Sequence, residues 1–209
     1  VVSAINDAAG KRAVATPTEL LEVLAMAQRV SQRSGGAFDV TVGGLRGWRF
    51  RRDDPRLPEP EEVRAQLALV NWKELVLDER AQTAQLARTG MRMDLGGIAK
   101  LYILEAGRRA LEARGVRRAL VNGGGDVVAH SDGAPWRVGV RDPRAPERLL
   151  GVVEVKNGAV AASGDYERFF ERDGRRYHHI LDPRTGYPAE GARGVTLVGA
   201  SAEAVNGLG

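Results

Sequence analysis

Residues 97–130 decide the fold class of this chain, and they read GIAKLYILEAGRRALEARGVRRALVNGGGDVVAH. A long helix is predicted over about 97–114, and Gly115 ends it. Short apolar strands are predicted near 118–122 and 126–130. The glycines between these strands predict a tight turn, with ligand binding by the glycine run as the alternative.

The rest of the chain contributes a second long helix and many short strands. This helix is predicted over 18–33, with Thr16 and Glu19 in capping-box spacing and Pro17 at the first helical position. The small residues of 162–166 are interpreted as a corner of the chain. Further predicted elements are a short helix near 61–69, a hairpin within 74–92, strands near 136–140, 149–155 and 194–199, two arms around Asp173-Gly174, and a helix start at Ser201. Two long helices among many short strands indicate an α+β fold with a mainly antiparallel sheet.

The composition excludes several classes of protein. The 209 residues are 43% hydrophobic and 28% charged, which is typical of a folded domain rather than a disordered tail. The absence of cysteine excludes disulfides, cysteine-ligated zinc and thiol nucleophiles. Lys and Arg total 31 against 27 Asp and Glu, for a formal charge of +4. The cations are scattered among acids and do not alternate with aromatic residues, so nucleic-acid binding is not expected.

The segment at 94–100 combines an acid, two glycines and a lysine at a predicted helix start. Unpaired backbone N–H groups at such a start attract phosphate, and the glycines allow a ligand to approach the main chain. Lys100 at this end of a helix favours a bound anion, because it opposes the helix dipole. The alternative is an ordinary strand-to-helix corner with a solvated lysine, and the residues alone leave both open.

A second dense segment is His178-His179-Ile180-Leu181-Asp182-Pro183-Arg184-Thr185-Gly186. A histidine close to an aspartate is a candidate general base at neutral pH. If the segment is a strand, the two adjacent imidazoles face opposite sides, so only one of them faces a given cleft. A surface histidine beside a Pro-Gly turn is the alternative.

Together these motifs resemble the ApbE family of FAD:protein FMN transferases. The resemblance runs from Ser3 to the last residue. It is carried by GAFDVTVG at 36–43, MDLGGIAK at 93–100, VNGGGD at 121–126, VAASGDY at 160–166 and YHHILDPRTG at 177–186. It implies an α+β, ApbE-like (T-fold-like) single domain over residues 1–209, with the N-terminal segment and the C-terminal helix incomplete.

The resemblance also implies a set of site residues. His179 would be the general base, and Asp182 would orient either this histidine or its loop. The Gly97 carbonyl would bind Mg²⁺ together with Asn206, which occupies a position where the family usually has an aspartate. A neutral amide there predicts weaker metal binding. The residues that would contact FAD are Ala37, Phe38, Asp39, Asp94, Lys100 and Ile180. Leu101 replaces a usual glycine and is expected to narrow the nucleotide pocket.

The activity implied by the resemblance is magnesium-dependent transfer of FMN from FAD to a Thr or Ser hydroxyl of a target flavoprotein, with release of AMP. Two alternatives stay open: an FAD pyrophosphatase that yields FMN and AMP, and a non-catalytic FAD-binding maturation partner. The expected location is the periplasm, or a membrane anchor facing it, with a cytoplasmic location not excluded. A lipid anchor, if one exists, would lie outside residues 1–209.

Overall fold

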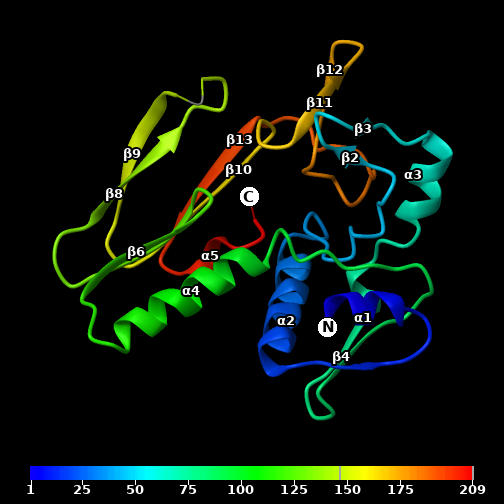
Figure 1. Cartoon of the computed structure of the whole chain (residues 1–209), viewed down its shortest axis with the longest axis horizontal. Helices are drawn as coiled ribbons and strands as arrows, with labels where there is room; N and C mark the ends of the chain where they lie inside the picture. The colour runs from blue at the N-terminus through cyan, green and yellow to red at the C-terminus, as the bar shows by residue number, and fades with distance from the viewer. Residues whose placement is uncertain (146, 209) are drawn as a thin grey trace. The chain divides into compact units, whose positions relative to one another are not determined.

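The computed structural model describes residues 1–145 and 147–208, and these group into two compact units (Figure 1). Unit 1 comprises Val1–Leu95 and Glu167–Glu190, and unit 2 comprises Gly96–Tyr166 and the chain from Gly191 onward. Each unit therefore takes in two separate stretches of chain. The prediction of one domain over the whole chain stays a prediction.

Unit 1 is built from short elements around one long helix. Strands β1, β5 and β4 form an antiparallel sheet in that order, and β2–β3 and β11–β12 form two-stranded antiparallel ribbons. The elements are α1 (Val2–Asp7), β1 (Val14–Ala15), α2 (Thr18–Arg33), β2 (Arg49–Phe50), β3 (Pro55–Arg56), α3 (Pro60–Leu67), the 3-10 helix η1 (Trp72–Glu74), β4 (Leu75–Asp78), β5 (Thr83–Leu86), β11 (Phe169–Arg172) and β12 (Arg175–His178).

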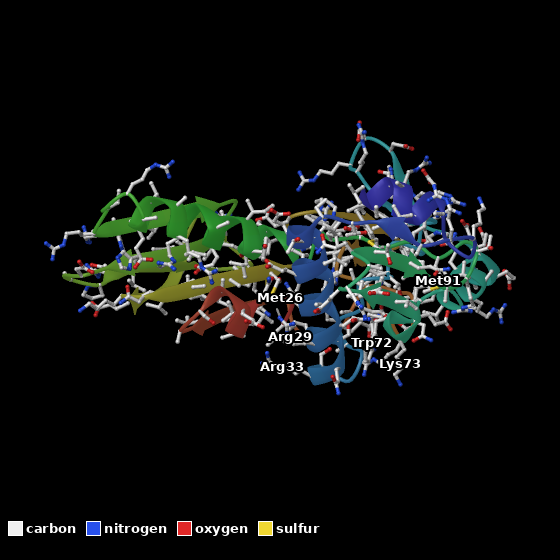
Figure 2. All side chains as sticks on the ribbon, turned by 90° about the horizontal axis from the view of Figure 1, so that it is seen from below. Met26, Arg29, Arg33, Trp72, Lys73 and Met91 are labelled. Atoms are coloured by element: carbon white, nitrogen blue, oxygen red, sulfur yellow. The ribbon has the colours of Figure 1, made fainter. Side chains whose placement is uncertain are left out.

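Helix α2 has the predicted bounds and buries one apolar face. Its buried residues are Leu21, Val23, Leu24, Met26, Ala27, Val30 and Ser31. Figure 2 shows Met26 along α2 with Arg29 and Arg33, and Trp72 and Lys73 on η1. The Gln28 side chain donates a hydrogen bond of 2.6 Å to the Leu75 carbonyl, which ties α2 to β4.

The predicted capping box at the start of α2 is wrong. Pro17 occupies the N-cap position, and no side chain caps the helix there. The Thr16 hydroxyl instead donates to the Val14 carbonyl at 2.8 Å. Thr16 is buried, so its hydroxyl satisfies a buried carbonyl next to β1 and is not available to the helix.

An aromatic cluster forms a second part of the core of unit 1. The rings of Trp48 and Phe50 stack with centroids 5.6 Å apart, and those of Phe170 and Tyr177 stack at 5.3 Å. The indole N–H of Trp48 donates to the Gly186 carbonyl at 2.9 Å. This buried bond secures the 178–186 segment to the core.

Unit 2 is a four-stranded antiparallel sheet in the order β13-β10-β7-β6, with a separate ribbon formed by β8 and β9. Its elements are α4 (Ala99–Glu112), β6 (Arg118–Gly123), β7 (Asp126–Ser131), β8 (Trp136–Arg141), β9 (Leu149–Val155), β10 (Gly158–Gly164), β13 (Gly194–Gly199) and α5 (Ala202–Val205). The antiparallel pairing and the two long helices confirm the predicted fold class.

The four-stranded sheet is covered on both faces. Helices α4 and α5 lie along one face, as Figure 1 shows, and their core comprises Leu101, Val128, Ala159, Ala202 and Val205. Leu101 is 3% exposed, so its bulk packs into this core and not into an open cavity. The β8–β9 ribbon packs against a second buried cluster, which comprises Val127, Ala129, Val155 and Val160.

The predicted glycine turn is confirmed, and one central strand is missed. Gly124 and Gly125 link β6 to β7 with φ values of 63° and 99°, the left-handed region that glycine enters without strain. Residues 162–164, expected in a corner, belong to β10, which pairs with β13 and β7. Small residues suit β10 because α5 packs against it. Among the described residues, none of the helices combines the length and apolar content required to cross a bilayer.

Candidate active site

The segment at 94–100 carries the chain from unit 1 into unit 2. The backbone N–H of Asp94 donates to the Val40 carbonyl at 2.8 Å, so Asp94 lies beside the 37–39 segment although more than fifty residues separate them. The turn at 96–98 then leads into α4, which begins at Ala99.

Lys100 is held by a buried carboxylate. Its ammonium lies 2.7 Å from Asp126 Oδ2, and its side chain is 45% exposed. Asp126 is 7% exposed, and its Oδ1 accepts the Ala162 N–H at 2.9 Å. Lys100 is therefore a half-exposed cation in a defined position on the first turn of α4, where a phosphate would meet both the cation and free backbone N–H groups.

Asp126 is a functional candidate that the sequence reasoning missed. The glycine turn before it is readable, but the residue types do not say that Asp126 would face Lys100 across 26 residues of chain. The signal that could have found it is an acid at the first position of a strand, directly before three apolar residues, because such an acid needs a partner when buried.

Asn206 connects the end of α5 to the start of α4. It is 3% exposed, and its Nδ2 donates to the Ile98 carbonyl at 2.8 Å. The predicted pair, Gly97 and Asn206, therefore belongs to one corner of unit 2. Both would supply neutral oxygen atoms, which suit a hard cation that keeps several waters. Among residues 1–145 and 147–208, no group of three His, Cys, Asp or Glu residues could hold a metal ion.

The His179 loop, defined here as residues 178–189, carries the predicted base. The Arg168 carbonyl oxygen is hydrogen-bonded to two groups of His179, the backbone N–H at 3.1 Å and the ring Nδ1 at 3.3 Å. A carbonyl accepts only from a protonated nitrogen, so Nε2 keeps the lone pair. Burial lowers the pKa of His179, and the charge of Arg168 lowers it further. The imidazole is therefore neutral at pH 7 and able to accept a proton.

The two adjacent histidines have different partners, although only His178 belongs to a strand and His179 lies in the bend that follows it. His178 ends β12 and is 7% exposed, with its Nε2 bonded to the Ala189 carbonyl at 2.9 Å. His179 is half-buried and bonds to Arg168. Only His179 therefore combines a free ring nitrogen with access to solvent.

Asp182 organises its loop. Its carboxylate accepts three hydrogen bonds from Arg184: from the backbone N–H and Nε at 2.9 Å, and from Nη2 at 2.7 Å. The Arg184 guanidinium lowers the pKa of Asp182, which stays ionised at neutral pH. The backbone N–H of Asp182 donates a hydrogen bond of 2.8 Å to the Tyr187 carbonyl, which closes the turn between these residues. These bonds support one of the two predicted roles for Asp182, orientation of the loop. They do not support orientation of His179 by Asp182, because His179 Nδ1 bonds to the Arg168 carbonyl instead.

The predicted FAD-contacting residues of unit 1 fall into two groups. Ala37 is exposed, and Phe38 is half-buried. The backbone N–H of Phe38 donates a hydrogen bond of 3.0 Å to Ser34 Oγ. Ile180 is half-buried on the His179 loop. These three can offer surface to a ligand.

Asp39 has a different environment. Its Oδ1 accepts from the N–H and hydroxyl of Thr41, and its Oδ2 accepts from the Trp72 N–H at 2.9 Å. Asp39 is 5% exposed, so its carboxylate shapes the loop that carries Ala37 and Phe38.

Comparison with known proteins agrees with this arrangement. A sequence model described as the ApbE family matches residues 1–208. The chain belongs to the ApbE family. A protein of Klebsiella pneumoniae (strain 342) named FAD:protein FMN transferase is 39% identical over 188 residues, which cover 89% of this chain and 58% of that protein. One of the same name from Treponema pallidum is 35% identical and covers 90% of this chain and 57% of that protein.

Solved structures of the ApbE family have the same fold. The ApbE protein of Thermotoga maritima superposes with a TM-score of 0.92 at 37% identity, covering all of this chain and 69% of that one. The apo flavinyl transferase ApbE of Pseudomonas stutzeri gives 0.84 at 32% identity, with 99% of this chain and 66% of that chain covered. The predicted ApbE-like α+β fold is confirmed. The chain spans less than three fifths of the two curated relatives above.

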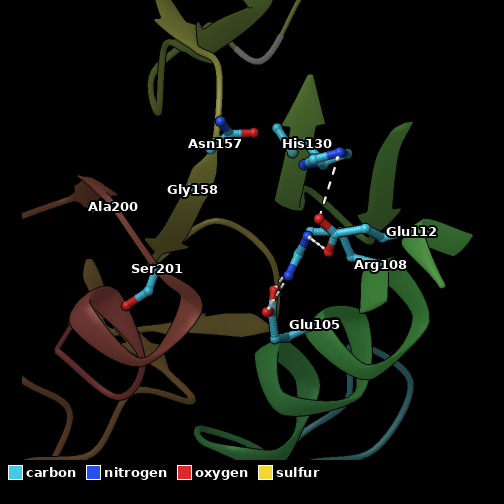
Figure 3. Close-up of a pocket in the computed structure, with 9 residues that line it drawn as sticks. Glu105, Arg108, Glu112, His130, Asn157, Gly158, Ala200 and Ser201 are labelled. Atoms are coloured by element: carbon cyan, nitrogen blue, oxygen red, sulfur yellow. Dashed lines mark hydrogen bonds and ion pairs between the residues drawn. The ribbon is translucent and has the colours of Figure 1, made fainter. Parts of the chain in front are cut away.

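This ApbE family member also has a polar pocket of about 270 Å³ in unit 2 (Figure 3). Arg108 occupies its wall with ion pairs to Glu105 and Glu112, both at 2.8 Å, and the Arg108 bond lowers the pKa of Glu105. The lining residues are Glu105, Arg108, Glu112, Ala129, His130, Asn157, Gly158, Ala200 and Ser201. None of the predicted site residues is among them.

Proposed function

We propose that this chain carries the catalytic residues for transfer of FMN from FAD to a Thr or Ser hydroxyl of a target flavoprotein, with release of AMP. The relatives named FAD:protein FMN transferase and the flavinyl transferase structures support this activity. In the reaction, the acceptor oxygen attacks the phosphorus of the FMN half. The bond from that phosphorus to the bridging oxygen breaks, and AMP leaves with this oxygen.

The observation that carries the proposal is the state of His179. Its Nδ1–H is directed to the Arg168 carbonyl, and its lowered pKa keeps Nε2 unprotonated. A hydroxyl is a weak nucleophile until its proton is accepted. His179 Nε2 would take the proton of the acceptor hydroxyl during the attack.

Lys100 supplies positive charge for the phosphates. Its pairing with Asp126 fixes the ammonium on the first turn of α4 and does not involve the backbone N–H groups there. The exposed Ala37 and the half-buried Phe38 and Ile180 would offer apolar contact to the flavin nucleotide. The flavin nucleotide would thus be bound by groups that take no part in proton transfer.

Magnesium is part of the proposal. The oxygen donors of Gly97 and Asn206 are chemically suited to it, with further coordination from substrate phosphates and water. When bound, the ion would neutralise charge that develops on the phosphate oxygens. Its affinity in the absence of nucleotide is expected to be low, because both protein donors are neutral.

The full-length protein, incubated with FAD, Mg²⁺ and a candidate acceptor, tests the proposal. Covalent flavin fluorescence on the acceptor together with equimolar AMP supports it. AMP that forms equally without acceptor would establish a pyrophosphatase instead. Stoichiometric FAD binding with neither product would establish a non-catalytic flavin carrier.

We also propose a periplasmic or membrane-anchored location for the full-length protein, in line with the resemblance described above. A fusion of the full-length protein to a reporter that is active only outside the cytoplasm tests this. Activity of the reporter supports the location, and its inactivity beside a positive export control would overturn it.

A further inference from the structure

His178 lies directly before the proposed base, His179, and has no part in the proposed reaction. It is 7% exposed, and its Nε2 lies 2.9 Å from the Ala189 carbonyl. Because a carbonyl accepts, Nε2 carries the proton, and Nδ1 is left as an acceptor. This Nδ1 is fully buried and has no hydrogen-bond partner among the described residues.

Packing alone does not account for a histidine at this position. A buried acceptor without a partner is unfavourable, and an apolar side chain of similar size would fill the space without one. The gain that histidine offers over such a side chain is the donor at Nε2. The bond from His178 to Ala189 is therefore the feature that requires this residue type.

Ala189 links the two neighbours of the base. Its carbonyl accepts from the His178 ring, and its N–H donates to the Ile180 carbonyl at 2.9 Å. The residues before and after His179 are thus both attached to Ala189, while His179 itself bonds to Arg168. The backbone of the base is held from both sides at the open end of the His179 loop.

We infer that His178 is a positioning residue, which holds the His179 loop closed through Ala189 so that His179 keeps the orientation required for proton transfer. The inference rests on the proposed function for its catalytic consequence only. The structural part, that the ring N–H of His178 stabilises the base of the loop, is independent of the reaction. An imidazole displaced by as little as about 1 Å loses much of its value as a base.

Glutamine and asparagine carry the same amide group at different distances from the backbone, so substituting each for His178 tests whether a donor must extend as far as the Ala189 carbonyl. In His178→Gln the amide nitrogen extends about as far from the backbone as Nε2, so the bond to Ala189 can form. In His178→Asn the amide nitrogen stops near the position of Nδ1 and cannot reach. His130→Gln is the matched control, since His130 lines the pocket of unit 2 and takes no part in the reaction.

The first readout is kinetic. His178→Asn is expected to lower kcat at least tenfold with KM for FAD changed less than twofold, because the flavin-contacting surfaces remain. His178→Gln is expected to retain at least a third of wild-type kcat, and His130→Gln to match the wild type. Equal kcat in the Asn and Gln variants would overturn the inference.

The second readout does not need turnover. Hydrogen exchange of the amides at Asp182 and Ala189 is expected to accelerate at least tenfold in His178→Asn and to stay near wild type in His178→Gln. Amides of β4 and β5 in the same unit serve as the reference for general loss of stability. Faster exchange at 182 and 189 matched by β4 and β5, or no change at all, would contradict the inference. An inactive wild type with the expected exchange pattern would instead count against the proposed function alone.

Discussion

The His179 loop of unit 1 and the corner at the start of α4 in unit 2 hold their functional groups by different means. In the loop, the functional side chains bond to groups close in sequence. Asp182 bonds to Arg184, two positions away, and His179 bonds to the carbonyl of Arg168. In the corner, the functional side chains bond to groups on distant elements. Lys100 pairs with Asp126, and Asn206 bonds to the Ile98 carbonyl across 108 positions. The polar groups of the loop are therefore held mainly by near neighbours, with the Trp48–Gly186 bond tying the loop to the core, whereas the corner exists only when the sheet and both helices of unit 2 have assembled.

The largest expected effect tests whether the loop carries the chemistry. His179→Ala removes the proton acceptor and is expected to lower the transfer rate by ~10²–10⁴-fold. FAD affinity should stay within about threefold, because the binding groups remain; both are measured by transfer assay and by titration of flavin fluorescence. Turnover unchanged from the wild type would remove His179 from the mechanism and move the chemistry to the corner.

The pH dependence of transfer sharpens the same assignment. Burial lowers the pKa of His179, so the imidazole becomes protonated, and loses its function as a base, only below the ordinary histidine range near 6.5. The expected kcat/KM is flat at pH 7 and falls about tenfold per pH unit once pH drops below the lowered pKa. A pH–rate profile on the wild type measures this. An acidic limb centred above pH 7 would be incompatible with the geometry of the loop.

Asp126→Asn tests the long-range bond of the corner. The amide oxygen can still accept from Ala162, but the charge that holds Lys100 is gone. KM for FAD is expected to rise about tenfold or more, with a smaller change in kcat, since the substitution acts on binding. Asp132→Asn is the control, because its partner Arg117 is an exposed surface cation and such pairs contribute little. Equal KM values for the two variants would mean that Lys100 needs no partner.

Asn206→Asp sets two effects of the corner against each other. The carboxylate adds a negative charge for Mg²⁺, and a few-fold tighter metal dependence of transfer is expected. The same substitution removes the donor to the Ile98 carbonyl, so metal-free stability should fall by about 1–3 kcal/mol. Magnesium titration and thermal unfolding with EDTA measure the two. A metal titration that does not respond would say that Asn206 is not a ligand.

The smallest effect is expected for Arg184→Gln in the loop. Arg184 holds the pKa of Asp182 below its ordinary value, so the pair contributes stability above the unfolded pKa, near 3.9, and loses it as pH falls through the lowered folded pKa. The arginine side chain is exposed, so the contribution at pH 7 is small. Unfolding curves at pH 7 and pH 2 should show a slight difference that disappears at the lower pH. A difference that grows in acid would contradict the pairing.

Local pattern was sufficient for part of this molecule. The apolar periodicity of 18–33 predicts α2 with its observed bounds, and the glycine run at 123–125 predicts the turn between β6 and β7, because both depend on near neighbours. The clustering of His, Asp and Arg at 178–186 likewise identifies the His179 loop as a dense site. In contrast, β10 escaped prediction, since its small residues are explained only by the helix that packs on them.

The amino-acid sequence by itself determined the α+β class, the family and the residue types of the candidate site. The tertiary structure alone decided which partner each of them has. Arg168 orients the base through a carbonyl, which every residue type possesses, so no pattern of side chains could reveal it. Asp126 meets Lys100, and Ala189 meets His178, only because sheet pairing and loop closure bring them together. Residue type sets which bonds a group is able to make, whereas the packed chain determines which of these bonds form.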